Sequence, residues 1–435
     1  MEARKVVYLR KKKVLVQGTA DSLQKFFSNA VSYNYETVAI LSEDRIAIEL
    51  DEKDLDVFTP QALPKLIYGL VDGVVLTCAK DSLVKYFFRQ GLEPRKIFLW
   101  NAEEGWGNLT LPHKDGTQVV YFCGLEFHIR NEDDLKFFNE IFWRLQSQWQ
   151  VKNLSPQLYP VLLEERFQQR TGRLLDLNNP QTLTEKIQWL KIFDATPIKS
   201  RLADKYAVRS WIAEKIGDEY LIPLLGVWED FDDIDFNDLP NQFVLKCNHG
   251  WNMNIIVRDK KTFDKRNARE KINAWLAVDF GAQNLELHYS RIKSKIIAEK
   301  FMTNTGEPDI IDYKFWCFNG HVEYVQLDRA RSTNHVQRFY SVDWKPLSFI
   351  IASHKLDDKI SEKPPQLEKM LNIAQSLSAG FSIVRVDLYC VKDRIYFGEM
   401  TFTPLAGNFS YNSESINEYL GSLLKLPDAS APPRL

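Results

Sequence analysis

A succession of short, apolar β-like runs from Phe243 onward constrains the fold of this chain more than any other feature. The runs are QFVLKC, NIIV, KIIAEKFM, DYKFWCFNGHVEYVQL, VQRFYSVD, FSIVRVDLYCV and RIYFGEMTFTP. Runs of this length, rich in β-branched and aromatic residues, predict strands. Because they follow one another closely, we expect mostly antiparallel pairing in this late part of the chain.

A helical region precedes these strands, from Leu162 to about Val227. The segment TLTEKIQWLKIF opens with Thr182 and carries Glu185 three residues later, which is the capping-box pattern of a helix N-terminus. ADKYAVRSWIAEKIG is amphipathic and stops at Gly217, so we expect a helix there as well. Helices followed by antiparallel strands predict an α+β domain.

The first part of the chain shows a different pattern, in which strand-like runs alternate with helical segments. KVLVQ (Lys13–Gln17), TVAILSED, VDGVVLTCAK and KIFLW predict strands, and DSLQKFFSNAVSYN and DSLVKYFFRQGL predict helices. This alternation favours a parallel sheet and a Rossmann-like α/β domain. Its glycine fingerprint is poor, because Gly18 is not followed by the other two glycines of a pyrophosphate-binding turn. A dinucleotide, a sugar nucleotide and no ligand all remain open.

One further helix is expected between the two regions. NEDDLKFFNEIFWRLQSQWQ, which begins at Asn131, has apolar residues at helical spacing and an Asn/Asp-rich start. The two prolines of the following LSPQLYP break a helix. We therefore expect a Rossmann-like domain in residues 1–150 and a second domain in residues 151–435.

Composition excludes several classes of partner. The chain has 56 basic and 58 acidic residues, so no basic excess argues for nucleic acid. Its five cysteines are scattered, which argues against a disulfide framework or a zinc cluster and favours a reducing cytoplasm. No apolar run has the length of a membrane-spanning helix, and none near Met1 resembles a secretion signal.

Two groups of polar residues stand where chemistry is expected. Lys246 closes an apolar run before a loop, where it can meet a phosphate or simply extend to water. Arg385 and Asp387 share one face of a strand, and Glu399 and Thr401 share one face of the next, in a hairpin around VKDR. Hard oxygen ligands of this kind suit Mg²⁺ with a nucleotide triphosphate. A surface ladder of ion pairs is the alternative.

Two weaker groups complete the candidates. Glu299–Lys300–Phe301–Met302 follows an apolar strand and offers backbone groups for a purine edge, with Asp312 and Lys314 close behind in sequence. A carboxylate at that place suits ribose hydroxyls. Arg329 and Arg331 alternate at the end of another run, where they can hold an anion or remain solvated.

Taken together and in this order, the motifs resemble the ATP-grasp superfamily, and within it the TupA-like branch named for teichuronopeptide biosynthesis. The resemblance covers roughly residues 165–425 and is highly specific as a set, although each motif alone is weak. Its carriers are NNPQTLTEKIQWLKIFD, LADKYAVRSWI, YLIPLLGVW, FVLKCNHG, NIIVRDK, IIAEKFM, DYKFWCFNG, RFYSVDW and VRVDLYCVKDRIYFGEMTFTP. It implies an ATP-grasp fold behind the Rossmann-like domain.

The resemblance also implies roles for particular residues. Lys246 resembles the lysine that contacts the nucleotide phosphates, with Lys205 as its companion, and Arg385 resembles the arginine that steadies the transferring phosphate. The implied nucleotide-binding set is Lys205, Lys246, Gly250, Glu299, Met302, Asp312 and Lys314. The implied magnesium ligands are Asp387, Glu399 and Thr401, although many relatives carry asparagine at the position of Thr401.

The activity implied is an ATP- and Mg²⁺-dependent ligation that joins a carboxylate to an amine through an acyl phosphate. For the TupA-like branch we expect an amine or amino acid joined to a uronic acid during capsule or cell-surface polysaccharide biosynthesis. The enzyme is expected in the cytoplasm, and docking to a membrane-associated polysaccharide assembly stays open. Two alternatives remain: a catalytically impaired scaffold that binds nucleotide or glycan, and an ATP-dependent phosphotransferase acting on a sugar.

The loop after Lys246 departs from the pattern of these relatives. They usually carry Ser-Gly after CNHG, whereas Trp251 and Asn252 stand here. Glycine approaches phosphate closely and adopts positive φ, which tryptophan does not do freely. The loop can still close with Trp251 as a lid, bind ATP loosely, or belong to a domain that only binds. Because Lys246 and the hairpin residues remain, we favour an active site.

Overall fold

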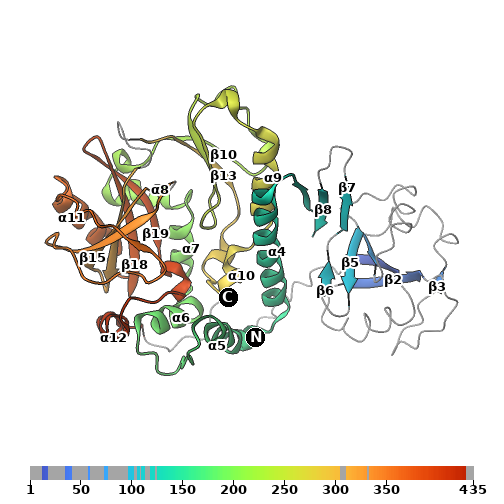
Figure 1. The fold of residues 1–435 in the computed structure, drawn as a ribbon, viewed down its shortest axis with the longest axis horizontal. Helices are drawn as coiled ribbons and strands as arrows, with labels where there is room; N and C mark the ends of the chain where they lie inside the picture. The colour runs from blue at the N-terminus through green and yellow to red at the C-terminus, as the bar shows by residue number, and fades with distance from the viewer. Residues whose placement is uncertain are drawn as a thin grey trace, which may run out of the picture. The chain divides into compact units, whose positions relative to one another are not determined.

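The computed structural model of the chain describes residues 12–17, 35–41, 57–58, 73–76, 97–101, 105–107, 109–112, 118–122, 125–303, 310–330 and 333–427 (Figure 1). The chain divides into two compact units, Met1–Leu145 and Gln146–Leu435. The boundary expected between residues 150 and 151 lies a little further along the same helix, α4 (Glu132–Asn153).

Unit 1 contains a mostly parallel six-stranded sheet in the order β3-β2-β1-β4-β5-β6. Only β5 and β6 pair antiparallel. The predicted strands agree with β1, β2, β4 and β5. The two predicted helices and Gly18 lie outside the described residues, so the Rossmann-like architecture stays a prediction. The strands are β1 (Lys12–Gln17), β2 (Tyr35–Leu41), β3 (Val57–Phe58), β4 (Gly73–Leu76), β5 (Ile97–Asn101) and β6 (Gly105–Gly107).

An antiparallel three-stranded sheet follows, and then helix α4. The sheet has the order β7-β8-β9 and was not predicted; its strands are β7 (Leu109–Pro112), β8 (Gln118–Phe122) and β9 (Leu125–Ile129). The helix predicted from Asn131 is confirmed. The Asn131 side chain accepts hydrogen bonds from the backbone N–H groups of Asp133 and Asp134, both at 2.9 Å, and so caps the helix start.

Unit 2 begins with helices, as predicted: α5 (Tyr159–Thr171), α6 (Leu183–Phe193), α7 (Pro197–Ala203) and α8 (Val208–Ile216). The capping box is present, since Thr182 and Glu185 satisfy each other's backbone N–H groups. The helix expected over ADKYAVRSWIAEKIG is shorter than predicted and begins at Val208. Asp204 interrupts it by accepting hydrogen bonds from the N–H groups of Tyr206 and Ala207. This turn takes Lys205 out of the helix.

A four-stranded antiparallel sheet forms the first wall of unit 2, in the order β10-β13-β11-β12. Alternation along β11 buries Phe243, Leu245 and Cys247 on the side of helix α9 (Lys265–Leu276) and turns Val244 and Lys246 to the opposite face. The strands are β10 (Leu224–Trp228), β11 (Phe243–Cys247), β12 (Asn254–Val257) and β13 (Ile296–Lys300).

A larger sheet forms the second wall, in the order β17-β16-β15-β14-β18-β19. Helix α11 (Leu367–Ser378) packs on one face over an apolar core. Helices α6 and α12 (Glu414–Leu423) share the aromatic core of the other face (Figure 1), and Ala282 of the short α10 (Phe280–Asn284) belongs to the same core. The strands are β14 (Asp312–Phe318), β15 (His321–Arg329), β16 (Val336–Ser341), β17 (Lys355–Leu356), β18 (Ile383–Val391) and β19 (Arg394–Thr401).

The hairpin predicted around VKDR is formed by β18 and β19. Its turn places Lys392 at φ 50° and Asp393 at φ 61°, the left-handed pair that suits a tight two-residue hairpin.

Among the described helices, none combines the length and the apolar character needed to cross a bilayer.

Candidate active site

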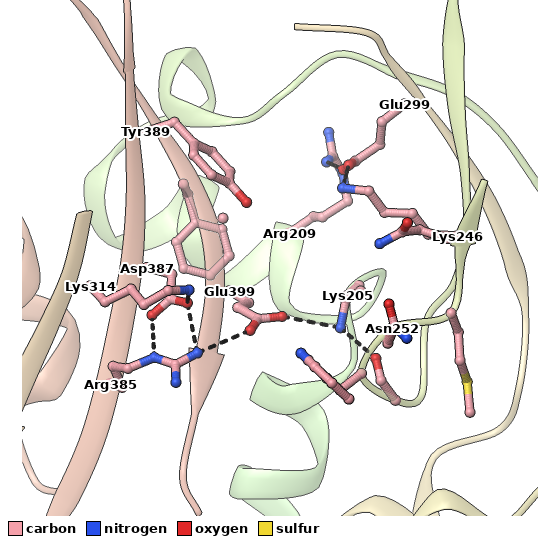
Figure 2. A pocket seen from close by; sticks show the side chains of 16 residues that line it. Lys205, Arg209, Lys246, Asn252, Glu299, Lys314, Arg385, Asp387, Tyr389 and Glu399 are labelled. Atoms are coloured by element: carbon pink, nitrogen blue, oxygen red, sulfur yellow. Dashed lines mark hydrogen bonds and ion pairs between the residues drawn. The ribbon is translucent and has the colours of Figure 1, made fainter. Parts of the chain in front are cut away.

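Two adjoining cavities lie between the two sheets of unit 2. The first, about 110 Å³, is strongly charged, and the second, about 310 Å³, is largely apolar. Both are lined by Lys246, Asn252, Asn254, Glu299 and Tyr389, so they form one continuous site. Figure 2 shows the lining of the charged cavity. A ligand with an apolar ring at one end and several negative charges at the other fits this division.

The structure brings almost all predicted site residues to these cavities, although they are spread over some two hundred positions of sequence. The charged cavity is lined by Lys205, Lys246, Gly250, Glu299, Lys314, Arg385, Asp387 and Glu399. The apolar cavity is lined by Lys246, Glu299, Met302 and Asp312. Thr401 lines neither but hydrogen-bonds to Arg385 and Glu399.

The apolar compartment is built from the face of the small sheet that turns away from α9. Its walls are Ile222, Val244, Ile256, Phe301, Met302 and Ile310. Arg258 covers the ring of Phe301 from 5.1 Å. The buried carboxylate of Asp312 lies at the border with the charged cavity. Apolar walls beside one carboxylate suit a planar base with a hydroxylated sugar attached.

Two cations share Glu299 at the boundary between the cavities. Lys246 Nζ donates to Glu299 Oε2 at 2.6 Å, and Arg209 Nη1 donates to Glu299 Oε1 at 3.1 Å. Strand register explains the first contact, because Glu299 lies opposite Val244 and is therefore a diagonal neighbour of Lys246. The carboxylate is almost completely buried, so its charge depends on these partners.

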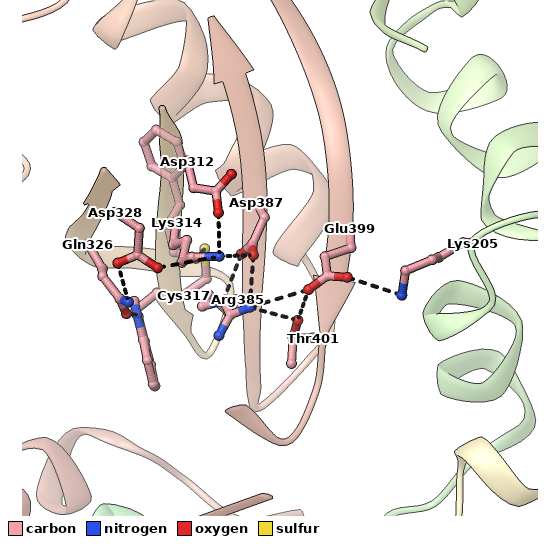
Figure 3. Close-up of polar contacts among 12 residues, drawn as sticks. Lys205, Asp312, Lys314, Cys317, Gln326, Asp328, Arg385, Asp387, Glu399 and Thr401 are labelled. Atoms are coloured by element: carbon pink, nitrogen blue, oxygen red, sulfur yellow. Dashed lines mark hydrogen bonds and ion pairs between the residues drawn. The ribbon is translucent and has the colours of Figure 1, made fainter. Parts of the chain in front are cut away.

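The β18–β19 hairpin supplies the charged end of the site (Figure 3). Register places Asp387 directly opposite Glu399 and Arg385 opposite Thr401, which confirms that the two strand faces meet. Arg385 grips Asp387 with two hydrogen bonds, Nε to Oδ1 at 2.7 Å and Nη2 to Oδ2 at 2.8 Å. Its Nη2 also lies 3.4 Å from Glu399 Oε1 and 3.2 Å from Thr401 Oγ1.

Lys314 neutralises the carboxylates on the adjoining strands. Its Nζ lies 2.8 Å from Asp387 Oδ2, 3.3 Å from Asp312 Oδ2 and 3.9 Å from Asp328 Oδ2. Strand β14 lies between β15 and β18, so a single lysine on its middle reaches acids on both neighbours. Burial lowers the pKa of the Lys314 ammonium, but these carboxylates outweigh burial and raise it above its ordinary value.

At Glu399 the neighbouring charges also outweigh burial, but here they lower the pKa. Burial raises the pKa of its carboxyl, but Lys205, Arg385 and Lys314 together lower it well below the usual range. The nearest of these contacts is Lys205 Nζ to Glu399 Oε2 at 3.2 Å. The side chain therefore stays ionised at neutral pH and can act as a hard anionic ligand.

The loop that departs from the expected Ser-Gly has a well-defined turn. Asn252 adopts φ 59°, the left-handed conformation that glycine usually supplies and asparagine tolerates. Gly250 is not in this conformation, but a Cβ there would come within 2.8 Å of Phe280. Lys205 Nζ donates to the Gly250 carbonyl at 2.8 Å and holds the loop beside the site. Trp251 lines the charged cavity and is 56% exposed.

Comparison with known families decides the assignment. The model of the TupA-like ATP-grasp family matches residues 185–425. The chain belongs to the TupA-like ATP-grasp family. This confirms the predicted resemblance and the ATP-grasp fold of the second domain. ATP-grasp ligases form carbon–nitrogen bonds and use ATP with Mg²⁺, so the prediction of an enzyme of this class and its cofactors is confirmed at the level of the superfamily.

Solved structures similar to this chain include three ligases. D-alanine–D-alanine ligase from Helicobacter pylori has 15% identity and TM-score 0.27, and the match covers 52% of this chain and 61% of that one, less than two thirds of it. The Bacillus anthracis ligase, complexed with ATP, has 11% identity, TM-score 0.28 and coverage of 90% and 86%. N5-carboxyaminoimidazole synthetase from Staphylococcus aureus, complexed with ADP, has 12% identity and TM-score 0.30, and the match covers 96% of this chain and 79% of that one. TM-scores this low support no inference about the chain. No curated protein sequence matches it.

The donor set fits the magnesium ion that ATP-grasp ligases use. Asp387 and Glu399 present carboxylate oxygens from directly opposed strand positions, with the Thr401 hydroxyl beside them. Mg²⁺ is usually held by one or two carboxylates, with waters and substrate phosphates completing the shell. In the described part of the chain, no group of three or more His, Cys, Asp or Glu residues is placed to hold a metal.

Several ATP-grasp site residues were missed from the sequence. Arg209 lies in the first turn of α8, four residues after Lys205, and its charge on an amphipathic segment gave no local signal of a site. Tyr389 lines both cavities, and it is two positions from Asp387 on the same strand face. Among the remaining additions, Asn254 and Arg258 are polar, whereas Ile222, Val244, Ile256 and Ile310 resemble ordinary core residues. Two arginines were expected either to hold an anion or to remain solvated. Arg329 pairs with Asp357 and lines neither cavity, and Arg331 lies outside the described residues.

Proposed function

We propose that this ATP-grasp protein is a carboxylate–amine ligase that forms an amide in the biosynthesis of a capsule or another cell-surface polysaccharide. The observation that supports it is the continuous site, in which an apolar compartment leads into a cavity carrying five cationic side chains and the Asp387–Glu399 carboxylate pair. We infer a uronic acid as the carboxylate substrate, an amine or amino acid as the second, and the cytoplasm as the place of reaction.

The roles of the residues follow from their positions. The apolar walls and Asp312 would hold adenosine, and Lys205 and Lys246 would neutralise the phosphates. Bound to Asp387 and Glu399, with Thr401 beside them, Mg²⁺ would offset phosphate charge. An oxygen of the acceptor carboxylate displaces ADP from the terminal phosphorus, giving an acyl phosphate. The amine nitrogen then attacks the acyl carbon, phosphate leaves with the C–O bond electrons, and the nitrogen loses a proton.

Arg385 has the position to serve both steps. Its guanidinium is clamped by Asp387 and directed toward Glu399 and Thr401, so it is fixed before any charge develops. A fixed cation stabilises charge that moves onto phosphate or onto a tetrahedral oxygen without the cost of reorganising. Burial lowers the pKa of Arg385, but Asp387 and Glu399 outweigh it and raise the pKa, so the charge is permanent.

Residues 1–150 we propose as a Rossmann-like domain that recognises a sugar nucleotide, followed by the ATP-grasp domain in residues 151–435. The parallel pairing of β1 with β2 and β4 supports such a sheet. Docking to a membrane-associated assembly would bring the polymer substrate to this site.

The test is ADP release in the presence of Mg²⁺, ATP, uronic acids and amines, combined with mass spectrometry of the product. We expect ADP release that requires both substrates and a product whose mass is the sum of acid and amine less one water. Glu399→Gln should lose this turnover, while the exposed Glu418→Gln on α12 should keep it. A phosphorylated acceptor would identify a phosphotransferase instead, and nucleotide binding without turnover across the panel would identify a scaffold.

A further inference from the structure

Glu299 occupies a position that two cations approach from opposite sides. It lies on β13, the strand between β10 and β11. Lys246 reaches it from β11, whereas Arg209 reaches it from α8, next to the chain segment that leads into β10. Each cation uses a different oxygen of the carboxylate, so either contact can persist without the other (Figure 2).

The two cations differ in how firmly they are held. Arg209 has a second anchor, because its Nη2 donates to the backbone carbonyl of Ile222 at 2.8 Å. For Lys246, Glu299 is the partner that the structure gives within the described residues. Lys246 also lines both cavities and has a flexible side chain. Lys246 is therefore the cation that can leave, and Arg209 the one that stays.

Lys246 can move away at low energetic cost only if another cation still neutralises the Glu299 carboxylate. Removing one partner from a buried ion pair leaves a charge that water cannot solvate, and this is strongly unfavourable. Arg209 removes that penalty, since it keeps a charge-assisted hydrogen bond to the same carboxylate. The pKa of Arg209 is lowered by burial, and Glu299 acts in the opposite direction to keep the guanidinium charged.

We propose that Arg209 is a positioning residue of the ATP site: it retains Glu299 and thereby allows Lys246 to move from Glu299 to the nucleotide phosphates. The proposal rests on the phosphate-binding role given to Lys246 under the proposed function. It predicts that Arg209 affects ligands with phosphates and that it acts through Lys246.

The experiment measures binding by isothermal titration calorimetry of the full chain with a non-hydrolysable ATP analogue and Mg²⁺, and separately with adenosine. We expect Arg209→Met to weaken binding of the analogue about tenfold, the size of one lost hydrogen bond to a charged group, and to change adenosine binding less than about twofold. Arg209→Lys should recover most of the loss. Arg201→Met, an exposed arginine on α7, is the matched control and should match the wild type.

A double-mutant cycle then separates positioning from other roles. In a Lys246→Met background, Arg209→Met should have little further effect on binding of the analogue. An equally large effect in that background would show that Arg209 acts independently of Lys246 and would overturn the proposal. Equal losses for the analogue and adenosine would show damage to the apolar compartment and would overturn it too. A wild type that binds no ATP analogue would instead refute the proposed function itself.

Discussion

Lys314 is the residue whose removal should expose most clearly how this site is balanced. The residue is 6% exposed, and its ammonium lies between Asp312 on its own strand and one aspartate on each neighbouring strand, Asp328 and Asp387. Lys314→Met keeps most of the side-chain volume and the apolar stem while deleting the charge. Three carboxylates then lose a shared cation, and the two contacts shorter than 3.5 Å, to Asp387 and Asp312, are lost outright.

The size of the effect follows from the burial of these groups. Breaking a buried ion pair by deleting one partner costs roughly 3–5 kcal/mol. Arg385 still holds Asp387, which argues for the lower half of that range. We expect a loss near 3 kcal/mol at neutral pH, which for a cooperative unit of the size of Gln146–Leu435 corresponds to a decrease in Tm of about 5 °C.

Differential scanning calorimetry at pH 7 and at pH 4.5 tests this reasoning. Burial raises the pKa of Asp328, but its hydrogen bonds and the charge of Lys314 lower it well below its usual range. Without Lys314, Asp328 takes up a proton more readily, so the deficit relative to the wild type should shrink as the pH falls. Lys363→Met, at an exposed position, is the matched control and should leave Tm unchanged. A deficit in Lys314→Met that is equal at both pH values would show that lost packing, and not unbalanced charge, is responsible.

Three further changes probe the structure around the site. Burial lowers the pKa of His288 from 6.5 to about 3. The stability that neutral His288 contributes is therefore complete above pH 6.5 and is lost as the pH falls toward 3. In urea unfolding, His288→Phe should make the free energy of unfolding depend less steeply on pH in this acid range. Asn252→Val places a β-branched residue at φ 59° and should cost about 1–2 kcal/mol and weaken ATP binding, whereas Asn252→Gly should do neither, as thermal shift with and without ATP would show. Thr182→Ala removes one half of the capping box and should lower the free energy of unfolding by about 1 kcal/mol in urea titrations.

The chemistry of the hairpin could be predicted from the sequence because strands have a simple period. Residues two apart share a face, so Arg385 and Asp387 had to point together, as did Glu399 and Thr401. The short VKDR turn fixes the register that makes these faces meet. Lys246, Glu299 and Lys205 lie on other elements, and no local pattern links them to the hairpin. Their place in the site came from the family resemblance.

Other parts of the site could not be predicted, for identifiable physical reasons. Val244 and Ile256 form the apolar compartment, but an apolar residue on a strand looks the same whether its face packs on a core or borders a cavity. Arg209 is one of several charged residues on a segment with amphipathic helical periodicity, so nothing in the sequence distinguishes it from a solvated charge. The break at Asp204 was missed because helical periodicity continues through it, although an aspartate that binds N–H groups two and three residues later is a recognised way to start a helix.

The loop at Trp251 departs from the Ser-Gly of its relatives without losing its turn. Glycine was expected to matter there because it approaches phosphate closely and adopts positive φ. In the structure Asn252 supplies the positive φ, and Gly250 is the position at which a Cβ would collide with Phe280. Trp251 therefore occupies a position with neither constraint, and its exposed side chain costs the turn nothing. Because the turn and both lysines are in place, the substitution by itself gives no reason to expect the loss of nucleotide binding.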